Sequence, residues 1–112
     1  MLKKQYRLTK NKDFEKVFKQ SASAYAPSLG LKVTANSLER PRFAILVSKK
    51  VSKKAVDRNK IKRQIRNILR EDYATKVKNY DVVIICLPAI INKTFEDIQT
   101  ELKFAFNKLK LI

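Results

Sequence analysis

The chain has 112 residues, of which 26 are Lys or Arg and 10 are Asp or Glu, so its formal net charge is +16 at neutral pH. This length suits one domain over residues 1–112, and an apolar fraction of 45% predicts that it folds despite its charge. The sequence contains no histidine, which excludes catalytic triads and zinc sites built on that residue. The charge itself predicts a polyanionic partner.

The sequence offers little sign of secretion or membrane insertion. No long apolar stretch follows the charged start MLKKQYRLTK, so we expect neither a signal peptide nor a membrane span. The single cysteine, Cys86, lies in the apolar run DVVIICLPAII, where a buried and unreactive thiol is expected. A chain with one cysteine forms no internal disulfide, and we therefore expect a cytoplasmic protein.

The first half of the chain predicts a helix followed by strands. Phe14, Val17 and Phe18 share one face at helical spacing, which predicts a short helix over residues 11–20. Apolar residues then alternate with small or polar ones over 28–36, as in a strand, and a further strand is expected within the region 22–36. After the turn NSLERP, the β-prone run RFAILVS predicts a central strand.

The second half predicts two helices around another strand. From Asp57 onward, one helical face carries the apolar residues Ile61, Ile65, Ile68 and Leu69, with Val77 as a candidate continuation. The run DVVIICL predicts a strand that Pro88 ends. Thr94 and Asp97 have capping-box spacing at the start of a last helix. Its apolar stripe consists of Phe95, Ile98, Leu102, Phe106 and Leu109.

These elements predict an α+β fold. Their order is α-β-β-(β)-α-β-α, in which a single central sheet of three to four strands is covered by helices.

The helix that begins near Asp57 carries an unusual charge pattern. The stretch VSKKVSKKAVDRNKIKRQIRNILR contains ten Lys or Arg residues and one acid, Asp57. At 100° per residue, the cations point roughly 135° away from the isoleucine face. A solvated surface helix normally mixes charges of both signs, whereas this helix has no acid between Asp57 and Glu71. We therefore expect a cationic ridge that binds a polyanion.

Nucleic acid is the polyanion that fits this ridge best. An interfacial membrane helix needs a free apolar face, but here the apolar face suits packing on a sheet. Asn59 beside Arg58 adds an amide that can both donate and accept hydrogen bonds. Phe14 and Phe18 are candidates either for the core or for stacking on unpaired bases, and the residues alone leave both readings open.

The stretch SKKVSKKAVDRNKIKRQIR resembles the protein subunit of bacterial ribonuclease P. That family has a Lys-Lys pair after a strand, a basic loop, an Ala, Arg-Asn-Arg, Ile, Lys-Arg and a further Arg. The matching residues are Lys49, Lys50, Ala55, Arg58, Asn59, Lys60, Ile61, Lys62, Arg63 and Arg66. A second family signature matches at Arg7, Leu8, Phe14, Val17 and Phe18. Together the two motifs, in the correct order, extend the resemblance over nearly the whole chain.

The chain also departs from the family pattern. Lys60 replaces the usual Arg, which keeps the charge but loses a planar bidentate donor. The basic loop VSKK is one residue longer than a common glycine-containing version, and Ser21 stands where glycine is frequent. Lys32 falls where some members carry an aromatic residue on the sheet.

The resemblance implies a subunit of an endoribonuclease that removes the 5′ leader of precursor tRNA. In the family, a large RNA is the catalyst and uses Mg²⁺ that the RNA and substrate mainly hold, so no catalytic or metal-binding residue is expected in the protein. The implied RNA-binding residues are Lys49, Lys50, Lys53, Lys54, Arg58, Asn59, Lys60, Lys62, Arg63, Arg66 and Arg70. The implied leader-binding cleft contains Phe14, Phe18 and Lys32.

The resemblance also implies a left-handed crossover between two parallel strands, as in the second domain of ribosomal protein S5. The expected partners are the catalytic RNA and precursor tRNA, without membrane, DNA or an obligatory protein partner. The neighbouring acids at 71–72 and 96–97 are expected to be helix-surface charges.

The main alternative is a ribosomal or other rRNA-binding structural protein. A DNA-binding regulator is a further one, although no partner helix and turn precede the basic helix.

Overall fold

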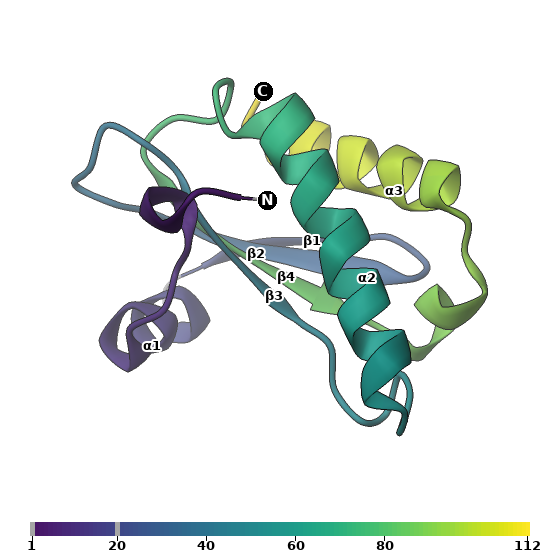
Figure 1. Cartoon of the computed structure of the whole chain (residues 1–112). Helices are drawn as coiled ribbons and strands as arrows, with labels where there is room; N and C mark the ends of the chain where they lie inside the picture. Colours follow the sequence, from purple (N-terminus) through teal and green to yellow (C-terminus); the bar gives the residue numbers. More distant parts are fainter. Residues whose placement is uncertain (1, 20) are drawn as a thin grey trace.

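The structure is a computed structural model, and it describes residues 2–19 and 21–112. The main elements of this part of the chain, in order, are α1 (Asn11–Lys19), β1 (Ala22–Tyr25), β2 (Leu29–Ala35), β3 (Arg42–Leu46), α2 (Ala55–Ile68), β4 (Tyr80–Cys86) and α3 (Phe95–Lys108) (Figure 1). Short 3₁₀ helices are formed by Lys4–Tyr6 and Pro88–Asn92. The predicted α+β fold and element order are confirmed, including the additional strand β1. Position 20, the predicted end of the first helix, lies outside the described residues.

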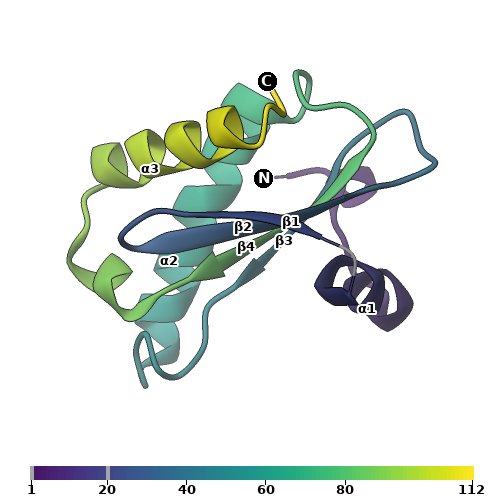
Figure 2. The same ribbon diagram turned by 180° about the vertical axis from the view of Figure 1, so that it is seen from behind.

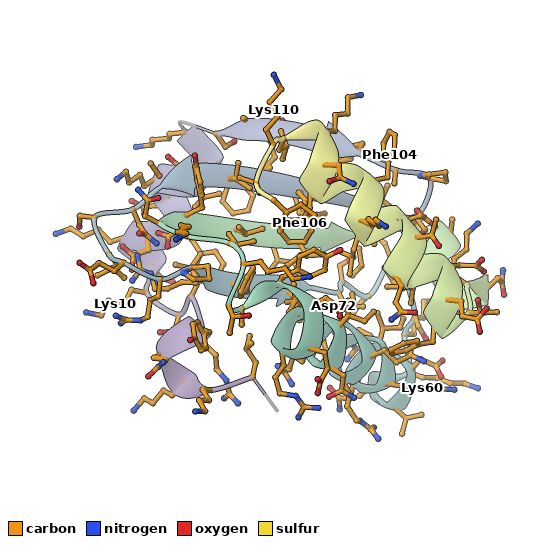
Figure 3. All side chains as sticks on the ribbon, turned by 90° about the horizontal axis from the view of Figure 1, so that it is seen from above. Lys10, Lys60, Asp72, Phe104, Phe106 and Lys110 are labelled. Carbon is orange, nitrogen blue, oxygen red and sulfur yellow. The ribbon has the colours of Figure 1, made fainter. Side chains whose placement is uncertain are left out.

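The four strands form one mixed sheet in the order β1-β2-β4-β3. The pairs β1–β2 and β2–β4 are antiparallel, whereas β3 and β4 are parallel and are connected through α2. In Figure 3 the helices α2 and α3 lie toward the viewer, β3 and β4 run left to right, and β4 lies above β3. The β3–α2–β4 crossover is therefore left-handed, as the resemblance implied and against the usual hand.

Helices cover the two faces of the sheet unequally. Alternate residues of the strands pack with α2 and α3 into the main hydrophobic core, which includes Leu31, Ile84 and Phe106. The helix α1 lies on the opposite face, where Val17 packs with Val83 in a much smaller cluster (Figure 2). Because α1 is short, it covers only part of that face.

The predicted apolar face of α2 is confirmed, since Ile61, Ile65 and Ile68 are all buried. The helix ends in a π-helical turn over Leu69–Tyr73, which the periodicity did not predict. Val77 is buried, but it follows this turn and does not extend the helical stripe. The wider turn is one place where a helix can change the direction of its side chains.

The predicted capping box begins α3. The Asp97 amide donates to Thr94 Oγ1 at 3.1 Å, and the Thr94 amide donates to Asp97 Oδ2 at 3.0 Å. Hydrogen bonding from Thr94, mainly from its backbone amide, lowers the pKa of the exposed Asp97 carboxyl. Phe95 was expected in the apolar stripe, but it remains 39% exposed because it lies on the first turn, outside the packed part of the helix.

Candidate nucleic-acid interface

The basic helix α2 presents a cationic surface to solvent. Its buried isoleucines fix which way it faces, and Arg63 and Arg70 are consequently exposed. Lys62 and Arg66 lie at the sides of the helix and are partly buried. The four lysines of the preceding loop are all exposed: Lys49, Lys50, Lys53 and Lys54.

Most of these cations lack an acidic partner. Within residues 2–19 and 21–112, ion pairs join Arg42 to Asp13 and Asp81, and Arg70 to Glu71. Among the predicted RNA-binding residues of this part of the chain, Arg70 alone has a carboxylate within ion-pair distance, with Nη2 2.9 Å from Glu71 Oε1. The positive charge of the surface is therefore almost uncompensated.

The one acid of the basic stretch is used to shape the loop. Ser52 Oγ donates to Asp57 Oδ2 at 2.9 Å, and Arg58 Nη1 donates to the Ser52 carbonyl oxygen at 2.9 Å. The Lys54 amide donates to Ser52 Oγ at 3.2 Å. Ser52 thus ties the loop to the first turn of α2, which holds the loop lysines beside the helix.

Two depressions continue from this ridge toward α1. The first has a volume of about 330 Å³ and is lined by Asn59, Lys62, Arg63, Arg66 and Asn67. The second, of about 270 Å³, lies along β3 and the N-terminal segment; its lining includes Arg7, Phe14, Leu46 and Arg66. Arg66 lines both depressions, and it therefore links the basic ridge to the side of the molecule that carries α1.

A salt-bridge network fixes α1 at one end of the sheet. Arg42 Nε and Nη2 donate to the two oxygens of Asp81 at 2.9 and 2.7 Å, and Arg42 Nη1 donates to Asp13 Oδ2 at 3.0 Å. Asp81 is only 2% exposed and also accepts a bond from Asn36 Nδ2 at 2.9 Å. Its carboxylate and Asp13 hold the Arg42 guanidinium charged and raise the arginine's pKa.

The orientation of α1 leaves an open surface beside it. Asp13 and Lys16 lie on the side of the helix that contacts the end of the sheet, where Lys16 Nζ donates to the Ala35 carbonyl oxygen at 3.4 Å. At 100° per residue, Phe14 and Phe18 lie roughly 60° and 100° to the other side of Val17. They consequently face the part of the sheet that α1 does not cover.

The strand register identifies the floor of this open surface. One row across the sheet consists of Ser23, Lys32, Val83 and Ala44. The next row consists of Tyr25, Gly30, Ile85 and Leu46. We call these two rows, together with Phe14 and Phe18, the sheet cleft, because three of these residues, Phe14, Ala44 and Leu46, line the second depression described above. Phe18 is 47% exposed and Phe14 is partly buried, so Val17 alone of the three apolar residues is a full core residue.

The cleft thus combines aromatic rings, aliphatic side chains and one predicted cation. Lys32 is partly buried in its floor, and none of the ion pairs described above involves it. Unpaired nucleotides need a ring for the base and a positive charge for the phosphate, and this surface offers both. Arg7, Asn67 and Tyr25 lie on these surfaces but were not among the predicted site residues, and Arg7 was named only as part of the second family signature. Asn67 follows Arg63 at helical spacing, a signal that could have placed it on the ridge.

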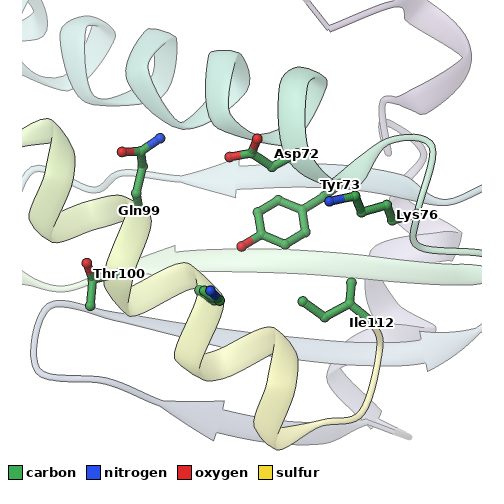
Figure 4. Close-up of a pocket in the computed structure, with 7 residues that line it drawn as sticks. Asp72, Tyr73, Lys76, Gln99, Thr100 and Ile112 are labelled. Carbon is green, nitrogen blue, oxygen red and sulfur yellow. The ribbon is translucent and has the colours of Figure 1, made fainter.

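A third pocket, of about 320 Å³, lies between the end of α2 and α3 (Figure 4). Asp72, Tyr73, Lys76 and Thr100 are part of its lining, which contains none of the predicted RNA-binding residues. The Tyr73 ring stacks on Phe106 with centroids 4.1 Å apart, and burial together with Asp72 raises the pKa of Tyr73 to about 12. Tyr73 therefore belongs to the core at the junction of the two helices.

The described residues do not fit a protein-held Mg²⁺. Within them, no three His, Cys, Asp or Glu residues gather in a group that could hold a metal ion. Asp13 and Asp81 approach the same point, but both bond Arg42, whose charge would repel a cation. Cys86 is buried and offers sulfur, whereas Mg²⁺ prefers oxygen ligands, so this side chain does not fit the ion either.

None of the helices in the described ranges combines the length and apolar character needed to cross a membrane.

Comparisons with known proteins identify the family of this chain. A sequence profile described as Ribonuclease P matches residues 2–110. The ribonuclease P protein component of a Cyanothece species is 34% identical over 128 aligned residues, covering 100% of this chain and 98% of that protein. The ribonuclease P protein component of a Synechocystis species is 37% identical over 112 residues, covering 99% and 90% of the two chains.

Solved structures show the same fold. A Staphylococcus aureus RNase P protein mutant with defective mRNA degradation activity superposes with a TM-score of 0.90 at 31% identity, covering 97% of this chain and 92% of that one. The RNase P protein from Thermotoga maritima gives a TM-score of 0.80 at 29% identity, covering 95% and 96%. With a profile match over almost its whole length and relatives of this similarity, the chain belongs to the ribonuclease P protein family.

Proposed function

We propose that this ribonuclease P protein binds a catalytic RNA through α2 and its preceding loop, and grips the single-stranded 5′ leader of precursor tRNA in the sheet cleft. One observation carries the proposal. Arg66 lines both the depression on the basic ridge and the groove that reaches Phe14, so the two surfaces adjoin at this side chain.

Each surface suits a different part of the substrate complex. The uncompensated cations of α2 favour a folded RNA with closely spaced phosphates, and binding there should weaken steeply with salt. Phe18, half-exposed beside Lys32, favours unpaired nucleotides, since stacking tolerates any base. The alternative of a ribosomal protein is not supported, because the Ribonuclease P profile matches residues 2–110, which contain both sequence motifs in order.

Phosphodiester hydrolysis is assigned to the RNA. Mg²⁺ would be held by the RNA and substrate, because the protein's described residues offer no fitting carboxylate group. The protein contributes binding and orientation of the leader, and no obligatory protein partner is required. Cys86 is a free, buried cysteine, and a chain whose single cysteine forms no internal disulfide suits a reducing cytoplasm.

Reconstitution tests this division of labour. RNA-free protein, the ribonuclease P RNA of the same organism and precursor tRNA are combined with Mg²⁺, and the product ends are mapped. Protein with RNA should give a single cut at the mature 5′ end, whereas protein alone should give none. Site-specific cleavage by RNA-free protein would contradict the proposal.

Degradation of mRNA is a second candidate activity, since the Staphylococcus aureus relative was solved as a mutant defective in it. The same assay therefore includes an unstructured mRNA. Cleavage of mRNA by RNA-free protein, but not by a variant with the α2 cations removed, would support this additional activity.

A further inference from the structure

Tyr25 and Gly30 form an unusual pair in the floor of the sheet cleft. The two residues are direct partners across the antiparallel strands β1 and β2. A Cβ at Gly30 would collide with Cδ1 and Cε1 of Tyr25, so the tyrosine ring lies flat against the glycine backbone. Gly30 does not have a positive φ, and its backbone is that of an ordinary strand residue. What the pair requires is therefore the absence of a side chain at position 30.

This arrangement leaves one ring face available. Gly30 is buried beneath the ring, while Tyr25 itself is 49% exposed, almost the same as Phe18. Because a flat ring uses one face on the sheet, much of its remaining exposure belongs to the other face. A ring without this support would rotate more freely. Because the sheet already restricts the Tyr25 ring, the ring loses less conformational entropy when a base stacks on it.

The position of the ring fits a second nucleotide. Tyr25 is on the same face as Lys32, since Ser23 pairs with Lys32 and lies two residues before Tyr25 on β1. The Lys32 row thus lies beside the Tyr25 row, ~7 Å away along the strands. A cation beside an aromatic ring at this spacing matches a phosphate beside a base.

We infer that Tyr25, held flat on Gly30, is a base-stacking residue of the leader-binding cleft, alongside Phe18. The inference rests on the proposed function, and it assigns the cleft a further contact that neither family signature contains. The ligand is an unpaired nucleotide of any base identity.

A tryptophan reporter tests the contact directly, because the chain has no tryptophan. The Tyr25→Trp variant is titrated with a mixed-sequence single-stranded RNA hexamer, without ribonuclease P RNA. The matched control is Phe104→Trp, since Phe104 is 51% exposed on α3, away from the cleft (Figure 3). Fluorescence of Tyr25→Trp should be quenched at saturation, and that of Phe104→Trp should not. Equal quenching, or none in either variant, would overturn the inference.

A double-mutant cycle separates the ring from its support. The reconstituted holoenzyme is measured against precursors with one and several leader nucleotides. Tyr25→Leu should weaken binding of the long-leader precursor by between about fivefold and 150-fold. Gly30→Ala keeps the ring but displaces it, so it should cause a similar loss. In the Tyr25→Leu background, Gly30→Ala should then have little additional effect.

The outcomes distinguish the two proposals. Wild-type protein that gains affinity with leader length, while Tyr25→Leu gains equally, would refute the role of Tyr25 and leave the proposed function intact. Wild-type protein without any leader-length effect would refute both. Two controls show whether a loss of affinity for long-leader precursors is local to the cleft. Tyr25→Leu and Gly30→Ala should bind ribonuclease P RNA alone with normal affinity, and their thermal unfolding should be unchanged.

Discussion

Arg63 offers the sharpest mutational test of the basic ridge. Its side chain is exposed on α2, on the opposite side from the buried isoleucines, and it lines the depression with Asn59, Lys62 and Arg66. Arg63→Ala should therefore leave the free energy of unfolding within about 0.5 kcal/mol of wild type. The change also removes one charge from a helix whose cations repel one another, so a slight stabilisation is expected.

The effect on RNA binding should be larger. A desolvated, charge-assisted hydrogen bond to phosphate contributes ~1–3 kcal/mol, which corresponds to between about fivefold and 150-fold in Kd. Loss of one phosphate contact should also reduce the slope of log K against log salt by about 0.7 to 1. Both quantities follow from titrating labelled ribonuclease P RNA with protein at several salt concentrations.

Two variants with the same change in net charge serve as controls. Arg70→Ala should cost less binding than Arg63→Ala, because Arg70 already bonds Glu71 through Nε and Nη2 and must give up an exposed pair worth ~0–1 kcal/mol. Lys103→Ala, in the pocket between α2 and α3, should leave binding almost unchanged. Equal losses in all three variants would mean that overall charge, and not the ridge, binds the RNA. Equal loss of folding and binding in Arg63→Ala would mean that the outward face is wrongly assigned.

Phe18→Leu should bind ribonuclease P RNA normally but lose the part of its precursor affinity that depends on leader length, ~1–3 kcal/mol. Parallel curves of affinity against leader length for wild type and variant would mean that Phe18 only packs against its neighbours. Asp81→Ala should cost about 3 kcal/mol of stability, measured by urea unfolding, because it strands the Arg42 guanidinium that Asp81 now pairs at 2.7 Å. Thr94→Ala should cost about 1 kcal/mol through loss of the α3 cap. The bonds from Thr94 lower the pKa of Asp97 from 3.8, so the stabilisation from the carboxylate is full above that pH and is lost as pH falls through the lowered value. Asp97→Asn should accordingly lose stability at neutral pH but not in strong acid, and a pH-independent cost would contradict this origin.

Helix faces were the part of the site that the sequence could predict. Periodicity alone placed Ile61 and Ile65 inside and Arg63 outside, because a helix has one fixed angle between successive residues. The capping box of α3 was also predictable, because it involves only Thr94 and Asp97, which are three residues apart in the sequence. The strands β3 and β4 were recognisable from their continuous apolar runs.

The shape of the cleft was not predictable in this way, because it depends on contacts between distant residues. Asp13 and Arg42 are 29 positions apart, and Arg42 and Asp81 are 39 apart, yet together they decide where α1 lies on the sheet. Tyr25 and Gly30 gave no recognisable signal, since only their pairing across β1 and β2 brings the ring over the glycine. The exposure of Phe18 follows from the same long-range placement of α1.

The dependence of precursor affinity on leader length tests the central claim most directly. The dissociation constants of precursor tRNAs with leaders of one to eight nucleotides are measured for ribonuclease P RNA alone and for the reconstituted holoenzyme. With the protein present, affinity should rise over the first few nucleotides and then level off, while mature tRNA gains little. An equal gain for mature tRNA and for every leader length would contradict a protein that grips the leader.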